Sequence, residues 1–225
     1  MKQFIVTILI FVSFLSFGQD FQKPDYQSIE KNIKKQNTSF YYPKLMERYL
    51  HCDTTLSLDE KRHLYYGYAF EPKYAPYDNS KYADSIAKLM SRKDKLGATE
   101  WQRIVEYGDK VLAKDPFSLR ALNYQMYALE RLNDGEKSYK KAIQMSIIIE
   151  AVLSSGHGMT PKDALFVINV EHELDIIGIL GLHPKGKQRF IEYNDYRAVA
   201  KNKYGIEGLY FDITPCLKSA ENSFK

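Results

Sequence analysis

Residues 99–153, TEWQRIVEYGDKVLAKDPFSLRALNYQMYALERLNDGEKSYKKAIQMSIIIEAVL, determine the predicted fold. After Thr99, apolar side chains recur at spacings of three and four, which is the rhythm of one buried helical face. They are Trp101, Ile104, Val105, Val111 and Leu112. A second long helix is predicted after Gly135, and its consecutive isoleucines, residues 147–149, indicate burial on more than one side. The segment therefore predicts paired helices and a mainly α fold.

Capping residues mark four predicted helix starts. Two pairs place a hydroxyl three residues before an acid or amide, so that the free N–H groups of a first turn are satisfied. Two others place a side-chain oxygen before a proline, whose missing N–H costs nothing in a first turn. The four pairs are Ser57 with Glu60, Thr99 with Gln102, Asp115 with Pro116, and Thr160 with Pro161.

Further helices are predicted over residues 26–36, 43–51 and 58–69, before the long pair. Near the C-terminus the period changes, because residues 195–200 and 207–213 have the composition of strands on either side of a turn-forming stretch. We therefore expect a small terminal β-hairpin over residues 195–213. An isolated hairpin is marginal in water, so it must pack on the helices or join another strand.

The segment from Trp101 to about Leu153 resembles tetratricopeptide helical repeats. Small residues and turn dipeptides carry the resemblance, which covers about one and a half units at a period near 34 residues. They are Asp115-Pro116, Ala121, Leu122, Ala128 and Leu132-Asn133-Asp134. Met126 stands where that repeat has glycine, and Gln125 where it has leucine. The resemblance implies antiparallel helix pairs over residues 99–155.

The first eighteen residues have the three parts of a secretory signal peptide. Lys2 forms the positive start, residues 4–17 are mostly apolar, and the small Ser16 and Gly18 predict cleavage before Gln19. The alternative is a membrane anchor, but a spanning helix needs about 20 apolar residues. We therefore expect an exported chain, periplasmic or extracellular, with residues 19–225 as a single helical domain that has no transmembrane segment.

Charge and cysteine content limit the possible partners. The net charge is +4 over 225 residues, and basic residues are interspersed with acidic ones instead of forming the stripe that nucleic acid requires. The short clusters Lys34-Lys35 and 185–189 are interpreted as solvated faces. Cys52 and Cys216 are free to pair after export, but the sequence leaves their pairing open.

One candidate site for chemistry combines His157 with Glu171 and His172, which a helical hairpin could bring together for metal binding or acid–base work. The alternative is a helix end, in which Gly156 and Gly158 adopt left-handed backbone and His157 serves turn geometry or a helix-end hydrogen bond. Residues 171–173 would then hold that turn in place. Zinc-protease, nucleophile-elbow and phosphate-loop motifs are absent from the sequence. No cofactor and no metal ion are predicted.

The N-terminal third is rich in tyrosine, and four of these residues form a candidate binding surface: Tyr42, Tyr49, Tyr65 and Tyr68. A tyrosine ring buries a large apolar area while its hydroxyl stays polar, so the same cluster also fits packing between helices. Acidic residues at 53, 59 and 60 lack the spacing of a calcium loop, and helix caps explain them better.

The chain after the signal peptide also resembles a family of uncharacterised exported bacterial proteins, catalogued as a domain of unknown function. The stretches that carry this resemblance are 40–49, 64–68, 155–158, 170–173 and 209–211. The resemblance implies an envelope or extracellular location and no particular activity.

Three functions remain open at this point. The first is a non-catalytic helical interaction module that binds a peptide or protein partner in the cell envelope. The alternative is a metal-dependent or acid–base hydrolase that uses His157, Glu171 and His172. The third is a structural or stress-related envelope role without a small ligand.

Overall fold

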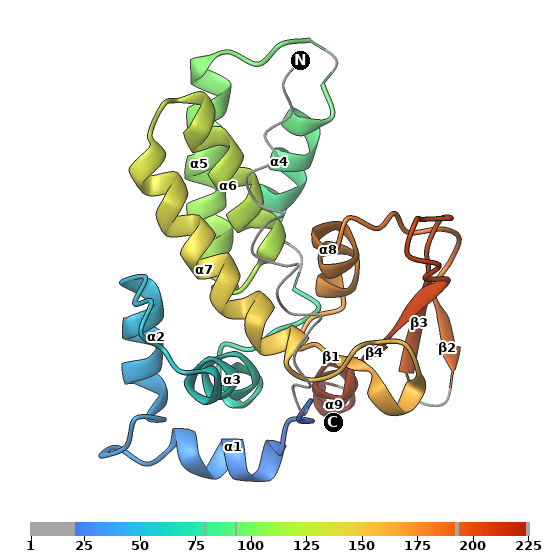
Figure 1. Ribbon diagram of the computed structural model, residues 1–225. Coiled ribbons are helices and arrows are strands. Elements are labelled where there is room, and N and C mark those ends of the chain that lie inside the picture. Colours follow the sequence, from blue (N-terminus) through green and yellow to red (C-terminus); the bar gives the residue numbers. More distant parts are fainter. Residues whose placement is uncertain (1–20, 79, 93, 192–193, 224–225) are drawn as a thin grey trace.

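The computed structural model describes residues 21–78, 80–92, 94–191 and 194–223. The predicted signal peptide, residues 1–18, and its cleavage point before Gln19 lie outside this part. The fold is mainly helical with a small sheet near the C-terminus, as predicted (Figure 1). Within the described ranges, no helix is both long and apolar enough to cross a membrane.

Three short helices begin the fold: α1 (Tyr26–Ile33), α2 (Tyr42–Leu50) and α3 (Leu58–Gly67), the last continued by a 3₁₀ turn, η2 (Tyr68–Phe70). The predicted capping box of α3 is present. Glu60 N–H donates to Ser57 Oγ at 3.2 Å, and Ser57 N–H donates to Glu60 Oε2 at 2.8 Å. Both halves of this cap are local in sequence, which is why the sequence could predict them.

A helical arm follows, consisting of α4 (Lys81–Met90), α5 (Ala98–Leu112), α6 (Leu119–Arg131) and α7 (Gly135–Leu153). These helices run back and forth, each packed on the next, and α7 extends down to the first three helices (Figure 1). Gly108 on α5 makes room for Gln125 on α6, whose amide donates to Val105 O and Asp109 Oδ1, both at 2.7 Å. The tetratricopeptide resemblance itself remains a prediction.

Two predicted caps in the helical arm are wrong. The N-cap of helix α5 is Gly97, two residues before the predicted Thr99, and Gly97 N–H donates to Glu100 Oε2 at 3.0 Å. Helix α6 begins at Leu119, because the Ser118 hydroxyl and not Asp115 receives the first-turn N–H. Thr160 precedes only a single 3₁₀ turn, η3 (Pro161–Asp163).

The predicted hairpin is confirmed as β3 (Asn194–Ala198) and β4 (Gly208–Asp212), which pair antiparallel. The hairpin lies inside a sheet with strand order β1-β4-β3-β2. Here β1 (Leu165–Phe166) is parallel to β4, and β2 (Arg189–Ile191) is antiparallel to β3. Helix α8 (Glu171–Ile179) precedes β2, and α9 (Thr214–Ser223) follows β4. The sheet therefore supplies the additional strands that an isolated hairpin needs.

The largest hydrophobic cluster joins α1–α3, the C-terminal half of α7 and one face of the sheet. The consecutive isoleucines 147–149 on α7 are all buried, so burial on more than one side of this helix is confirmed. A smaller cluster lies between α4, α5 and α6. Helix α7 thus connects the arm to the part of the fold that carries the sheet.

Candidate functional site

His157 lies in the turn after α7 and is exposed. Its Nδ1 is 2.7 Å from Asp163 Oδ2, and its backbone N–H donates to Asp163 Oδ1 at 3.1 Å. The Phe21 ring packs 3.8 Å from the imidazole, centroid to centroid. Gly158 has a φ of 75°, as predicted, but the prediction for Gly156 is wrong, since its φ is not positive. Gly156 is needed for another reason: a Cβ there would lie 2.4 Å from the Ala164 carbonyl oxygen. His157 therefore ties down a turn.

His172 is buried on α8, where its Nδ1 and the Tyr65 hydroxyl are 2.7 Å apart. Burial lowers the pKa of His172 to about 4, so the imidazole is neutral at pH 7. The hollow that it lines measures about 20 Å³, room for about one water molecule. Glu171 is exposed and its Oε2 lies 3.6 Å from Arg120 Nη1.

The structure does not bring His157, Glu171 and His172 together. In the ranges that the structure describes, no hydrogen bond or ion pair joins His157 to either of the others, and no group of three metal-ligating side chains could hold an ion. The adjacent positions on α8 point in different directions, as helical geometry requires. The described residues therefore give no support to an acid–base or metal site formed by these three side chains.

The four tyrosines of the predicted binding surface are buried, with exposed fractions of 6% or less. The rings of Tyr49, Tyr65 and Tyr68 pack edge-on against Phe117, with centroids 5.2 to 5.9 Å apart. The Tyr49 hydroxyl donates to the Pro116 carbonyl at 2.8 Å. The interpretation as helix packing is confirmed. The prediction of an exposed surface formed by Tyr42, Tyr49, Tyr65 and Tyr68 is wrong, because Phe117 and its neighbours cover the rings.

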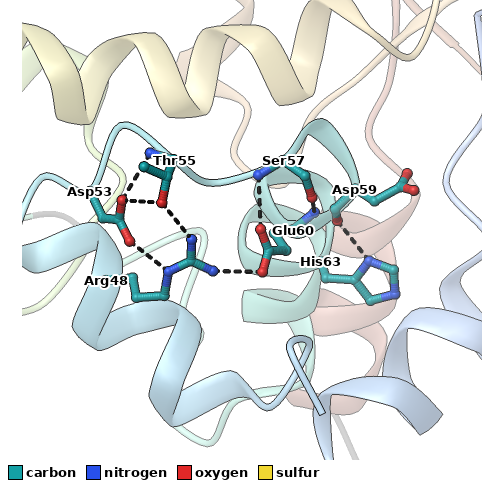
Figure 2. Close-up of polar contacts among 7 residues, drawn as sticks. All are labelled: Arg48, Asp53, Thr55, Ser57, Asp59, Glu60 and His63. Atoms are coloured by element: carbon teal, nitrogen blue, oxygen red, sulfur yellow. Dashed lines mark hydrogen bonds and ion pairs between the residues drawn. The ribbon is translucent and has the colours of Figure 1, made fainter.

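The acidic loop between α2 and α3 forms a closed network around Arg48 (Figure 2). The Arg48 guanidinium contacts Asp53 Oδ2 at 2.7 Å and Glu60 Oε1 at 2.6 Å, and also donates to Thr55 Oγ1 at 3.2 Å. Hydrogen bonds from Thr55 and Arg48 hold the pKa of Asp53 well below its usual range. The carboxylates of Asp53 and Glu60 are thus occupied by internal donors, as the interpretation as a linking loop with caps predicted.

A basic hollow lies on the outer part of the sheet and has a volume of about 750 Å³. Its lining comes from the segment that leads into β2, from β3 and the loop after it, and from the residues before β4. We call this site the basic hollow and define it by its charged and aromatic members, which are Lys185, Lys187, Arg189, Tyr196, Lys201 and Glu207. It contains four cationic side chains and one carboxylate.

An irregular segment of the edge strand creates this hollow. Arg189 pairs with Tyr196, and Pro184 forms an isolated bridge with Val199. Between these paired positions the edge chain has four residues, 185–188, and the β3 chain has two, 197–198. Two extra residues therefore bulge out of the ladder, and Gly186, with a φ of 74°, allows the bend.

The floor of the basic hollow is a ladder of side chains across three strands. Tyr196 lies opposite Arg189 on one side and Tyr210 on the other. The Arg189 guanidinium carbon is 4.7 Å from the centre of the Tyr196 ring, and the two tyrosine rings are 4.8 Å apart. A Cβ on Gly208 would lie 2.4 Å from the Tyr196 ring, so glycine is needed for this ring to lie across β4.

Among the described residues, none forms an ion pair with the cations of the basic hollow. In the part of the chain that the structure describes, Lys185, Lys187, Arg189 and Lys201 form no ion pair, and all four are exposed. Glu207 is the one acidic residue of the lining within the described ranges. The hollow therefore presents a concentrated positive potential on a fixed framework.

A family model described as a domain of unknown function, DUF4919, matches residues 27–222. The chain belongs to this family. No curated protein and no solved structure matches the chain. The DUF4919 match runs from α1 into α9, so it includes both the helical arm and the basic hollow.

The two cysteines of the DUF4919 chain are free thiols. Cys52 is partly exposed in the α2–α3 loop, whereas Cys216 is buried on α9. Burial raises the pKa of the Cys216 thiol to about 12, which keeps it protonated and unreactive. The possible disulfide that the sequence left open is therefore not formed in this structure.

Sequence reasoning located the basic segment 185–189 in the DUF4919 chain but treated it as a solvated face. The alternation Lys185-Gly-Lys187-Gln-Arg189 was the local signal. The sequence does not show the other side of the hollow. Tyr196 and Lys201 join the site only through the pairing of β2 with β3 and through the loop after β3.

Proposed function

We propose that the DUF4919 chain is a non-catalytic binding module that holds an acidic segment of a partner protein in the basic hollow. One observation carries this proposal: four cations that form no ion pair with any described residue surround one hollow of about 750 Å³. Opposite charge on a partner lowers the free energy of the complex and speeds encounter. The predicted helical interaction module thus uses its sheet as the binding face.

The shape of β2 supports recognition by side chains. A partner strand that adds to an open sheet edge needs a regular row of backbone groups. Here the edge strand is three residues long, and residues 185–188 bulge out of the ladder directly before it. Short edges, bulges and lysines are features that oppose strand addition. The acidic segment is therefore held by charged side chains.

We also propose that the module works outside the cytoplasm, in the periplasm or the extracellular space. The positive start, the apolar run and the small residues before Gln19 support export. Mass spectrometry of the protein from its native cells tests this point. A mature chain that begins at Gln19 supports export, and a chain that keeps residues 1–18 in the cytoplasmic fraction contradicts it.

Binding of a labelled peptide tests the proposed function. A fluorescent peptide of alternating Glu and Ala is titrated with the protein, and its anisotropy is followed. We expect saturable binding that weakens at least about tenfold between about 50 and 500 mM salt, since exposed charges are screened. A peptide with Gln in place of Glu should not bind.

Charge reversal locates the binding site. The double variant Lys187→Glu with Lys201→Glu should abolish binding of the Glu peptide. The matched control, Lys31→Glu with Lys44→Glu, makes the same change of net charge at exposed positions on α1 and α2 and should bind as the wild type does. Equal binding by the two double variants, or no binding of the Glu peptide to the wild type, contradicts the proposal.

A further inference from the structure

Arg189 is held in an orientation suited to a planar or tetrahedral oxyanion. Its guanidinium lies over the Tyr196 ring, and that ring packs on Tyr210. The three side chains come from neighbouring strands, β2, β3 and β4. An arginine stacked in this way loses little further freedom when it binds, and its N–H groups match two oxygens of a phosphate or carboxylate. No carboxylate of the described ranges occupies that fork.

The bulge adds backbone donors next to Arg189. Gly186 and Lys187 line the basic hollow, and Gly186 is in the left-handed conformation. The amide N–H groups of residues 186–188 donate to no acceptor in the part of the chain that the structure describes. Successive free amides in a turn of this kind make a concave site for anions. Backbone and side-chain donors therefore converge on one short segment.

The balance of charge indicates which anion fits. Among the residues that the structure describes, four cations face a single carboxylate, Glu207, so this part of the lining has an excess of three positive charges. A carboxylate carries one negative charge and two oxygens. A phosphate monoester carries about 1.5 to 2 negative charges and three strong acceptor oxygens at pH 7. The monoester therefore uses more of the donors that this hollow provides.

We infer that the basic hollow recognises a phosphate monoester on the acidic segment that it binds, with Arg189 and the amides of residues 186–188 as its donors. This inference rests on the proposed function and adds the chemical group to it. Arg189 is the specificity-determining residue, because its guanidinium rests on the Tyr196 ring and can donate to two oxygens at once. The positive electrostatic potential around it comes from Lys185, Lys187 and Lys201.

Three matched peptides test this inference. They share one acidic sequence and differ at the central residue, which is Ser, Glu or phosphoserine. Binding to the whole protein is measured by calorimetry. We expect the phosphoserine peptide to bind at least about tenfold more tightly than the Glu peptide, which corresponds to one added charge-assisted contact.

Arg189→Lys removes the bidentate guanidinium of Arg189 but keeps the positive charge. This variant should lose most of the preference for phosphoserine and still bind the Glu peptide, whereas Arg103→Lys, an exposed position on α5, should behave as the wild type. Equal affinity for the phosphoserine and Glu peptides overturns the inference and leaves the proposed function standing. Failure of all three peptides to bind overturns both.

Inorganic phosphate distinguishes the source of the group. We expect free phosphate to compete with the phosphoserine peptide only when it is present in large excess, because the segment contributes further contacts to the lysines. If free phosphate binds as tightly as the phosphoserine peptide, the hollow takes the free anion, and the assignment to a phosphorylated segment is overturned.

Discussion

Two arginines of this chain have opposite surroundings. Arg48, in the α2–α3 region, contacts two carboxylates and a hydroxyl within 3.2 Å (Figure 2). Arg189, in the sheet, rests on an aromatic ring and meets no carboxylate of the described ranges. The charge of Arg48 is therefore paired within the protein, whereas the charge of Arg189 is available to a ligand.

The difference indicates how each region uses its charge. Around Arg48 the polar groups hold a loop and a helix start in place, so that region contributes to folding. Around Arg189 the aromatic ladder and the bulge hold cations that repel one another, which is unfavourable for the free protein. Such a concentration of like charge is relieved when an anion binds. Four substitutions test this contrast.

Gly208→Ala should displace the Tyr196 ring from the floor of the basic hollow. Its new Cβ would lie 2.4 Å from the Tyr196 ring and 2.6 Å from the Arg197 carbonyl oxygen, so the strand or the ring must move. We expect the free energy of unfolding to fall by about 3 kcal/mol, and peptide binding to be lost. Urea denaturation measures the first effect. Gly135→Ala is the control, since nothing lies within 4 Å of that Cβ; equal unfolding midpoints for the two variants would refute the packing argument.

Arg48→Ala should affect stability alone. Removing the guanidinium leaves Asp53 and Glu60 without the cation that they share. We expect the free energy of unfolding to fall by about 1 to 2 kcal/mol, while affinity for the acidic peptide stays unchanged. Thermal denaturation and anisotropy are measured on the same sample. A loss of peptide binding without a loss of stability would reverse the roles assigned to the two regions.

Glu173 tests a third use of charge, because it is buried beneath the sheet. It contacts the Arg197 guanidinium and lies beside Asp195, and its pKa is raised to about 8, chiefly by burial. The native state therefore keeps a proton that the unfolded chain releases near pH 4.5. Between about pH 5 and pH 8, native protein binds more protons than unfolded protein, so rising pH removes stability.

Glu173→Gln should abolish that loss. We expect the difference in unfolding free energy between the variant and the wild type to grow in favour of the variant, by up to about 1.4 kcal/mol per pH unit from pH 5 to 8. The exposed neighbour Glu171→Gln serves as the control. A difference that stays constant with pH would show that Glu173 is ionised throughout this range.

Arg189→Ala should have the smallest effect on stability. The side chain is exposed and its contact with Tyr196 is a surface cation–π interaction. We expect the free energy of unfolding to change by no more than about 0.5 kcal/mol, while affinity for the acidic peptide falls at least about tenfold. Paired melting curves and titrations check both numbers. A large loss of stability would give Arg189 the same structural role as Arg48.

Much of the fold could be predicted because its signals are local. The apolar rhythm of α5 and α7, and the change of period near the C-terminus, require only neighbouring residues. The cap of α3 was predicted for the same reason. The cap of α5 was not, because Gly97 with Glu100 competes with Thr99 two residues later, and only the fold decides between them.

The candidate site depends on contacts that are distant in sequence. Tyrosines 49, 65 and 68 look the same in the sequence whether they are exposed or buried, and Phe117 from another helix decides it. Lysines and arginines at 185–189 looked like a solvated face until Tyr196 and a two-residue bulge placed them around a hollow. Strand register and bulges follow from three-dimensional pairing, which residue spacing along the chain does not record.

Chemical-shift mapping of the labelled protein with the phosphoserine peptide tests the contrast between the two regions most directly. We expect backbone amide signals of residues 185–189 and of the β3–β4 connection to move in a saturable way, while those of the α2–α3 loop stay in place. Saturable shifts in the α2–α3 loop or the helical arm, with none around Arg189, would contradict it.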